Sequence, residues 1–141
     1  MKLTAKQINE IAQELEAGMK IFTDRENLEI RTILDWDDIT DPGIWHKEQK
    51  KIEREWPDYI TIEKLEPGES FRIMESFVDE INDIKLKQDL IKILSRKSPF
   101  ANFKAEIESS AYRQKWFDFR TMKYEEYVKA QLEVENIEFE K

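Results

Sequence analysis

The sequence contains no cysteine, and glycine and proline are scarce, at 3 and 4 of 141 residues. The missing cysteine excludes disulfides, thiolate nucleophiles, iron–sulfur clusters and zinc sites built on cysteine. Because the three glycines lie far apart in the sequence, they form neither a phosphate-binding loop nor a dinucleotide fingerprint. The low glycine and proline content predicts a high helix content and few long loops.

Long apolar runs are also missing. No stretch approaches the length that crosses a membrane, and the first residues lead into an amphipathic pattern rather than an apolar signal core. We therefore expect a cytoplasmic protein with no membrane partner. Hydrophobic residues make up 40% of the chain, enough for a packed core. The length and the lack of a linker predict a single domain over residues 1–141.

The order of the elements follows from hydrophobic periodicity. Thr4 and Gln7 have the spacing of a capping box at the start of a first helix. Residues 19–23 and 28–34 are expected to form a hairpin, and residues 59–64 a third strand. A helix between them begins at Asp41-Pro42. All later elements are helices, with expected starts at Ser70, Asp83, Ser98-Pro99 and Ser109-Ser110.

Strands come early in this order and helices come late, which favours an α+β fold over a parallel α/β fold. We expect a small antiparallel sheet of about three strands, the hairpin plus one, packed against a mainly helical C-terminal half. The helical layer is expected because so small a sheet is not stable alone. The last residues are acidic and are expected to fray.

The charge is distributed unevenly along the chain, whose formal net charge is −8. Residues 95–123 carry seven basic and three acidic side chains, a local charge of +4, which leaves −12 for the rest. An acidic protein is repelled by nucleic acid unless its positive charge is concentrated. This segregation favours an oppositely charged partner, or self-association of acidic against basic surface.

Two stretches carry a family resemblance: SPFANFKAEIE at residues 98–108 and WFDFR at residues 116–120. They resemble the signature of a bacterial uncharacterised protein family, number one hundred and fifty-eight in the UPF series. Tyr59–Ile62 and Met74–Phe77 fit the same pattern, so the resemblance covers about residues 5 to 130. It implies a cytoplasmic bacterial domain and supplies no catalytic residue, ligand or partner.

The strongest candidate site is a contact surface in the basic, aromatic segment 95–123. Arginine and tryptophan side chains anchor many protein interfaces, and aromatic rings between cations can also stack nucleic-acid bases. The alternative is that the aromatic residues of this segment, Phe103 and Trp116 among them, pack in the core at helical spacing. The candidate contact residues are Arg96, Lys97, Lys104, Arg113, Trp116 and Arg120.

Three functions remain open at this point. The leading hypothesis is a non-enzymatic protein-interaction module that binds a protein partner or a second copy of the chain. The runner-up is binding of nucleic acid, with RNA favoured over DNA, through segment 95–123. The third is a metal-dependent enzyme that uses the acidic loop of residues 35–41.

The acidic loop is a poor match to a calcium-binding loop. If Asp35 is taken as its first ligand, Thr40 stands where glycine is needed and His46 where the final glutamate is needed. His46 is the only histidine, and a catalytic role would have to combine it with an aspartate of this loop. A half-exposed surface histidine explains it more simply. We therefore assign no catalytic, cofactor-binding or metal-ligating residue.

Overall fold

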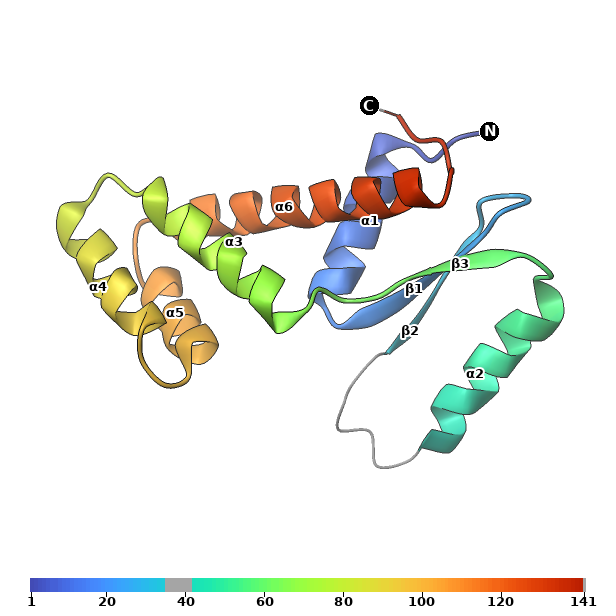
Figure 1. Ribbon diagram of the computed structural model, residues 1–141, viewed down its shortest axis with the longest axis horizontal. Coiled ribbons are helices and arrows are strands. Elements are labelled where there is room, and N and C mark those ends of the chain that lie inside the picture. The colour runs from blue at the N-terminus through green and yellow to red at the C-terminus, as the bar shows by residue number, and fades with distance from the viewer. Residues whose placement is uncertain (35–41, 141) are drawn as a thin grey trace. The chain divides into compact units, whose positions relative to one another are not determined.

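The computed structural model describes residues 1–34 and 42–140, with side chains for all of these except residues 42–46 (Figure 1). In this part of the chain, six helices and three strands confirm the α+β class. The chain divides into two units, residues 1–64 with 124–141, and residues 65–123. The expectation of a single domain stays a prediction. The elements are α1 (Ala5–Glu16), β1 (Met19–Asp24), β2 (Ile30–Leu34), α2 (Pro42–Glu55), β3 (Tyr59–Ile62), α3 (Pro67–Asp79), α4 (Ile84–Leu94), α5 (Pro99–Glu108) and α6 (Arg113–Val134).

The first unit is built on the predicted three-stranded antiparallel sheet, with strand order β2-β1-β3. The central strand pairs with both neighbours, so that Ile21 lies opposite Thr32 on one side and Ile62 on the other. Because side chains alternate along a strand, Ile21 and Phe22 point to opposite faces, and both are buried. The face that carries Phe22 packs against α2 in a small core cluster of Phe22, Ile33, Ile52 and Trp56.

Helix α1 begins at the predicted capping box. The Thr4 hydroxyl accepts the Gln7 backbone N–H at 3.1 Å, and the Gln7 side chain accepts the Thr4 N–H at 2.9 Å. These two bonds satisfy donors that the first turn of a helix leaves free. The helix then buries Ile8, Ile11 and Leu15 along one face and packs next to β1.

The expectation that the C-terminal residues fray is wrong. The Leu3 N–H donates to the Glu138 carbonyl at 3.0 Å, and the Glu140 N–H donates back to the Leu3 carbonyl at 2.8 Å. The Glu140 carboxylate also accepts the Ala5 N–H at 2.8 Å. Ile137 is buried at 7% exposure. A buried isoleucine and a carboxylate at the positive end of α1 hold this segment in place.

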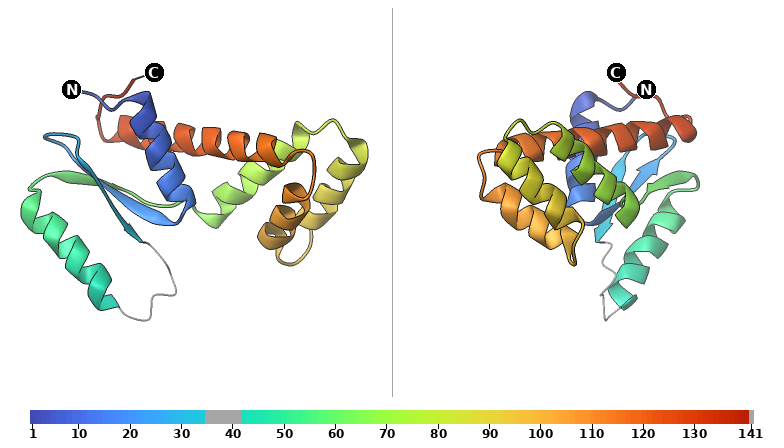
Figure 2. Two further views of the ribbon diagram at one scale, coloured as in Figure 1. Left: turned by 180° about the vertical axis from the view of Figure 1, so that it is seen from behind. Right: turned by 60° about the vertical axis from the view of Figure 1, so that its left-hand side comes forward.

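The second unit is a helical cluster of α3, α4, α5 and the first half of α6. Figures 1 and 2 show α4 and α5 side by side, joined by a short turn. Its buried core is rich in aromatic side chains and consists of Met74, Phe77, Val78, Ile81, Leu90, Phe103, Ile107 and Trp116. No described helix in either unit has both the length and the apolar character needed to cross a membrane.

Candidate contact surface

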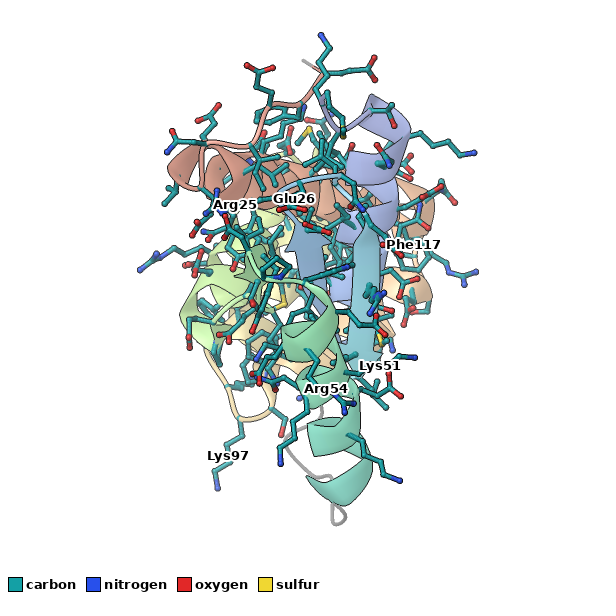
Figure 3. All side chains as sticks on the ribbon, turned by 90° about the vertical axis from the view of Figure 1, so that its right-hand side faces the viewer. Arg25, Glu26, Lys51, Arg54, Lys97 and Phe117 are labelled. Carbon is teal, nitrogen blue, oxygen red and sulfur yellow. The ribbon has the colours of Figure 1, made fainter. Side chains whose placement is uncertain are left out.

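Three of the predicted contact residues are exposed cations of the α4–α5 pair. Arg96 and Lys97 lie in the turn between Leu94, where α4 ends, and Pro99, where α5 begins. Lys104 follows on the exposed side of α5. Figure 3 labels Lys97, whose side chain extends away from the ribbon. The turn therefore presents positive charge to solvent.

Trp116 does not belong to an exposed surface, and its assignment as a contact residue needs correction. Its side chain is only 6% exposed. The centre of its ring lies 5.0 Å from the ring centre of Phe103 and 5.3 Å from that of Phe77. Offset and edge-on aromatic pairs at such distances stabilise a core beyond the area that they bury. The packing alternative is therefore correct for Trp116 and Phe103.

The cations at the start of α6 cover aromatic rings of the same segment. Cations three or four residues from a ring in a helix lie above it, and the ring attracts the charge. Arg120 is half-buried and interacts within the chain, so it is not a free cation. The alternation of cations and aromatic residues in this segment thus has a structural explanation. Measured from the cation to the ring centre, the three pairs are Arg113 with Phe117 at 5.3 Å, Lys115 with Tyr112 at 5.3 Å, and Lys123 with Phe119 at 5.4 Å.

An exposed face of α4 completes the surface that begins at the turn. Ile84 is 72% exposed and Ile91 is 52% exposed, while Leu90 is fully buried. Residues seven apart lie on one side of a helix, so the two isoleucines share a face. Lys85 and Lys92, also seven apart, run beside them and are exposed. We define the α4 face by these four residues with Gln88, Arg96 and Lys97.

The sequence interpretation missed the α4 face, although a signal for it exists. Leu86, Leu90 and Ile93 are spaced at three and four residues and form the buried stripe of α4. Ile84 and Ile91 are out of phase with this stripe. Apolar residues out of phase with the core of a helix mark a second face.

A shallow hollow of about 220 Å³ lies elsewhere in the second unit. Its lining combines aromatic rings with Glu80, Asn82 and Lys115. Sites for small organic ligands are usually about 300–1,000 Å³ in volume. Lys115 is also engaged with the ring of Tyr112. The hollow is therefore a weaker candidate for a binding site than the exposed α4 face.

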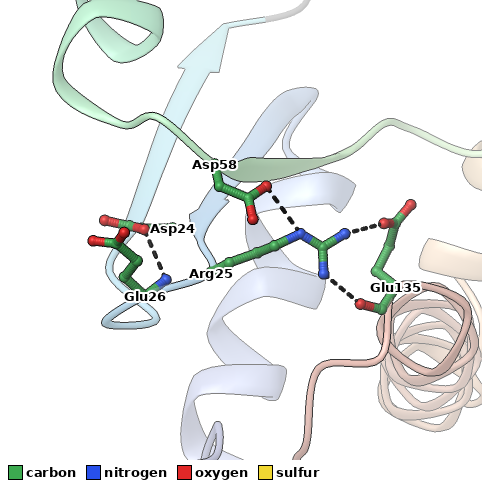
Figure 4. A network of polar contacts seen from close by, with 5 residues as sticks. All are labelled: Asp24, Arg25, Glu26, Asp58 and Glu135. Carbon is green, nitrogen blue, oxygen red and sulfur yellow. Dashed lines mark hydrogen bonds and ion pairs between the residues drawn. The ribbon is translucent and has the colours of Figure 1, made fainter.

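A polar network in the first unit surrounds Arg25 (Figure 4). Its guanidinium donates to the Glu135 carboxylate and to the Glu135 carbonyl, both at 2.6 Å, and pairs with Asp58 at 3.2 Å. Asp24 accepts the Glu26 N–H at 2.9 Å in the same turn. This network ties the hairpin to β3 and to the end of α6, a structural role.

A second arginine joins α2 to the sheet. Arg31 pairs with Glu55 at 2.5 Å and lies over the Trp56 ring at 4.5 Å. The hydrogen bond from Arg31 is the main reason that the pKa of Glu55 lies below its usual range. Glu55 stays ionised at neutral pH and fixes the last turn of α2.

The described residues hold no group of three or more carboxylate or histidine side chains placed to bind a metal ion. Residues 35–41 lie outside the described part of the chain, and the side chain of His46 is not described. The hypothesis of a metal-dependent enzyme thus has no described residue to support it.

Comparison with known proteins gives one match. The model of the Uncharacterised protein family (UPF0158) matches residues 2–141. No curated protein and no solved structure matches the chain. The family assignment confirms the resemblance carried by residues 98–108 and 116–120, and it brings no described activity with it.

Proposed function

We propose that this chain, which belongs to that uncharacterised family, is a non-enzymatic protein-binding module of the cytoplasm. The observation that supports this most strongly is the α4 face, where two largely exposed isoleucines lie beside two lysines. Exposed apolar side chains that share one face, bordered by charge, are typical of protein interaction sites. The turn with Arg96 and Lys97 extends the positive charge from the end of α4.

The exposed isoleucines have the energetic capacity to anchor a partner. Full burial of such a side chain contributes about 1.5–3 kcal/mol. Ile84 and Ile91 still expose half or more of their side chains, so most of this free energy becomes available only when another molecule covers them. Association also costs translational and rotational freedom, which means that the charged residues around the anchors have to contribute as well.

The charges select the kind of partner. Lys85, Lys92 and the two cations of the turn attract an acidic surface and raise the rate of encounter. A partner that fits therefore presents apolar residues surrounded by carboxylates. A second copy of this chain is one source of acidic surface, because the part outside residues 95–123 carries −12. Self-association is accordingly one form of the proposed function.

The alternative of nucleic-acid binding through segment 95–123 is less well supported. Base stacking requires exposed aromatic rings, whereas Trp116 and Phe103 are buried. The chain's own cations lie over three other rings of the segment, those of Tyr112, Phe117 and Phe119. Phe100, 44% exposed, is the aromatic residue of the segment most available for stacking.

The experiment is affinity capture of the tagged full-length chain from bacterial lysate, followed by sedimentation analysis of the purified chain. Ile84→Ser/Ile91→Ser removes the apolar anchors, and Lys85→Glu/Lys92→Glu reverses the adjacent charge. Met122→Ser/Val134→Ser is the matched control, since Met122 and Val134 are also exposed, at 43% and 74%.

The proposal predicts a partner, or a dimer of the chain, that both α4 variants lose and the control retains. A partner that all three variants retain would contradict the assignment to the α4 face. The absence of both a partner and a dimer would contradict the binding function itself.

A further inference from the structure

Helix α2 carries a stripe of four cations on its outer side. Lys47, Lys50, Lys51 and Arg54 are spaced at three, four and seven residues, and all four are exposed. At 1.5 Å per residue, the stripe extends along about 10 Å of the helix. Figure 3 labels Lys51 and Arg54 on this helix. We call these four residues the α2 stripe.

The α2 stripe lies opposite the buried face of the helix. Ile52 and Trp56, 2% and 4% exposed, pack against the sheet. With 100° per residue, the four cations occupy the side of the helix directly away from these two residues. Glu48 and Glu53 are exposed on its two flanks.

In the described part of the chain, the stripe lacks direct ion-pair partners. Among the described residues, no side chain forms an ion pair or a hydrogen bond with any of the four cations. Lys47 and Lys51 are four residues apart, as are Lys50 and Arg54, and like charges at this spacing destabilise a helix. The nearby carboxylate of Glu55 is held by Arg31. A ligand that neutralises the stripe removes this repulsion.

The chemistry of the stripe differs from that of the α4 face. It has no apolar or aromatic member, so it lacks the anchors of a protein interface and the rings that would stack exposed bases. Lysine is depleted at protein interfaces but is common at phosphate contacts. Insertion into a membrane surface requires a free apolar face, whereas the apolar face of α2 is buried.

We propose that the α2 stripe binds the phosphate backbone of double-stranded nucleic acid. A duplex presents one negative charge per about 1.7 Å of its axis, so the length of the stripe faces several phosphates. Four lysine and arginine side chains bind these phosphates without reading sequence. The remainder of the chain is acidic and repels a duplex, so contact is confined to the stripe. This repulsion is screened beyond about 8 Å at physiological salt.

The proposal predicts a specific dependence on salt. Four phosphate contacts give a slope of about −3.6 for the logarithm of the association constant against that of the salt concentration. Affinity therefore falls about 150-fold between 50 and 200 mM salt. Removing three of the cations reduces the slope to about −1.

The test measures fluorescence anisotropy of labelled 20-base-pair DNA and RNA duplexes with the full-length chain. Lys50→Gln/Lys51→Gln/Arg54→Gln removes three charges of the stripe. Lys2→Gln/Lys6→Gln/Arg72→Gln removes three exposed charges that lie outside both proposed surfaces and serves as the matched control. A polyglutamate peptide competes with the duplex as a polyanion without phosphate. Circular dichroism verifies that both variants fold.

We expect the α2 variant to lose at least tenfold in affinity for one or both duplexes at 50 mM salt, with the reduced slope, while the control binds like the native chain. The DNA and RNA arms identify the source of the phosphate backbone. Equal binding by the native chain and the α2 variant overturns the proposal. No binding by the native chain at 50 mM salt, or competition by polyglutamate as strong as by unlabelled duplex, overturns it as well.

Because the α2 stripe and the α4 face lie on different helices, this test is independent of the proposed protein-binding function. The capture experiment with the α4 variants reports on the protein partner, and the anisotropy experiment with the α2 variant reports on the duplex. Failure of one proposal therefore leaves the other measurable.

Discussion

The guanidinium of Arg25 is bound by both the carboxylate and the backbone carbonyl of Glu135, each at 2.6 Å, across 110 positions of sequence. Arg25 lies in the turn of the β-hairpin, and Glu135 directly follows α6. A planar guanidinium with two bonds to one residue fixes orientation as well as distance. This pair closes the first unit by linking an early hairpin to the last helix.

Arg25→Met is expected to lower the free energy of unfolding by about 1 kcal/mol, because the pair is partly exposed and water screens its charges. Arg54→Met is the matched control, since Arg54 makes no described ion pair. Urea denaturation of both variants measures the difference. An Arg25→Met variant as stable as the control would show that the network contributes no net stability.

Glu140→Gln is expected to weaken the N-terminus of α1, because the negative charge that faces the Ala5 N–H is lost. Charges at this position contribute about 0.3–1 kcal/mol. Hydrogen exchange should become faster at the Leu3 and Glu140 amides, which pair with the opposite terminal segment. Glu133→Gln, on an exposed side chain, is the control. Fast exchange at both amides in the native chain would support the fraying that the sequence predicted.

Arg31→Gln is expected to raise the pKa of Glu55 toward its usual range, because Arg31 supplies the hydrogen bond that lowers it. The stabilising effect of this pair is complete above the unfolded pKa of Glu55 and is lost as the pH falls through the lower folded value. An NMR titration of the Glu55 carboxyl group in both proteins measures the shift. Lys51→Gln should cause a smaller change. Identical titration curves for the native and Arg31→Gln proteins would be inconsistent with the pair.

Ser98→Gly is expected to raise the free energy of unfolding by about 0.5–1 kcal/mol. Ser98 precedes α5 with a φ of 53° and a ψ of 51°, in the left-handed region that a side chain disfavours. Glycine adopts this conformation without that penalty. Ser95→Gly is the control, because Ser95 has a φ of −91° and gains nothing from the substitution. A thermal midpoint that falls in Ser98→Gly would contradict the strain argument.

The features predicted correctly from sequence are those that depend on near neighbours. The capping box of Thr4 and Gln7 and the cap at Asp83 each depend on residues three positions apart, and both formed as expected. The three-stranded sheet followed from runs of β-rich residues and a turn. Helix α3 begins at Pro67 and not at the predicted Ser70, because proline suits the first turn of a helix.

The contact surface depended on tertiary packing, and local patterns did not determine it. The same aromatic spacing is compatible with a surface or with a core, and only the packing of Phe77 against Trp116 decides between them. The pairing of Arg25 with Glu135 is set by the fold and has no local signal. The sequence contains the spacing of Ile84 and Ile91 and that of the α2 stripe, but spacing alone does not determine which side chains the fold leaves exposed.

The most direct test of the protein-binding proposal is site-specific photo-crosslinking from the α4 face in living cells. Gln88 lies between Ile84 and Ile91 and is exposed, so a photoreactive amino acid at this position contacts whatever covers the face. Gln13, exposed on α1, is the matched control position. The proposal predicts a discrete crosslinked protein from position 88 and none from position 13. No crosslink from position 88, or the same products from both positions, would contradict it.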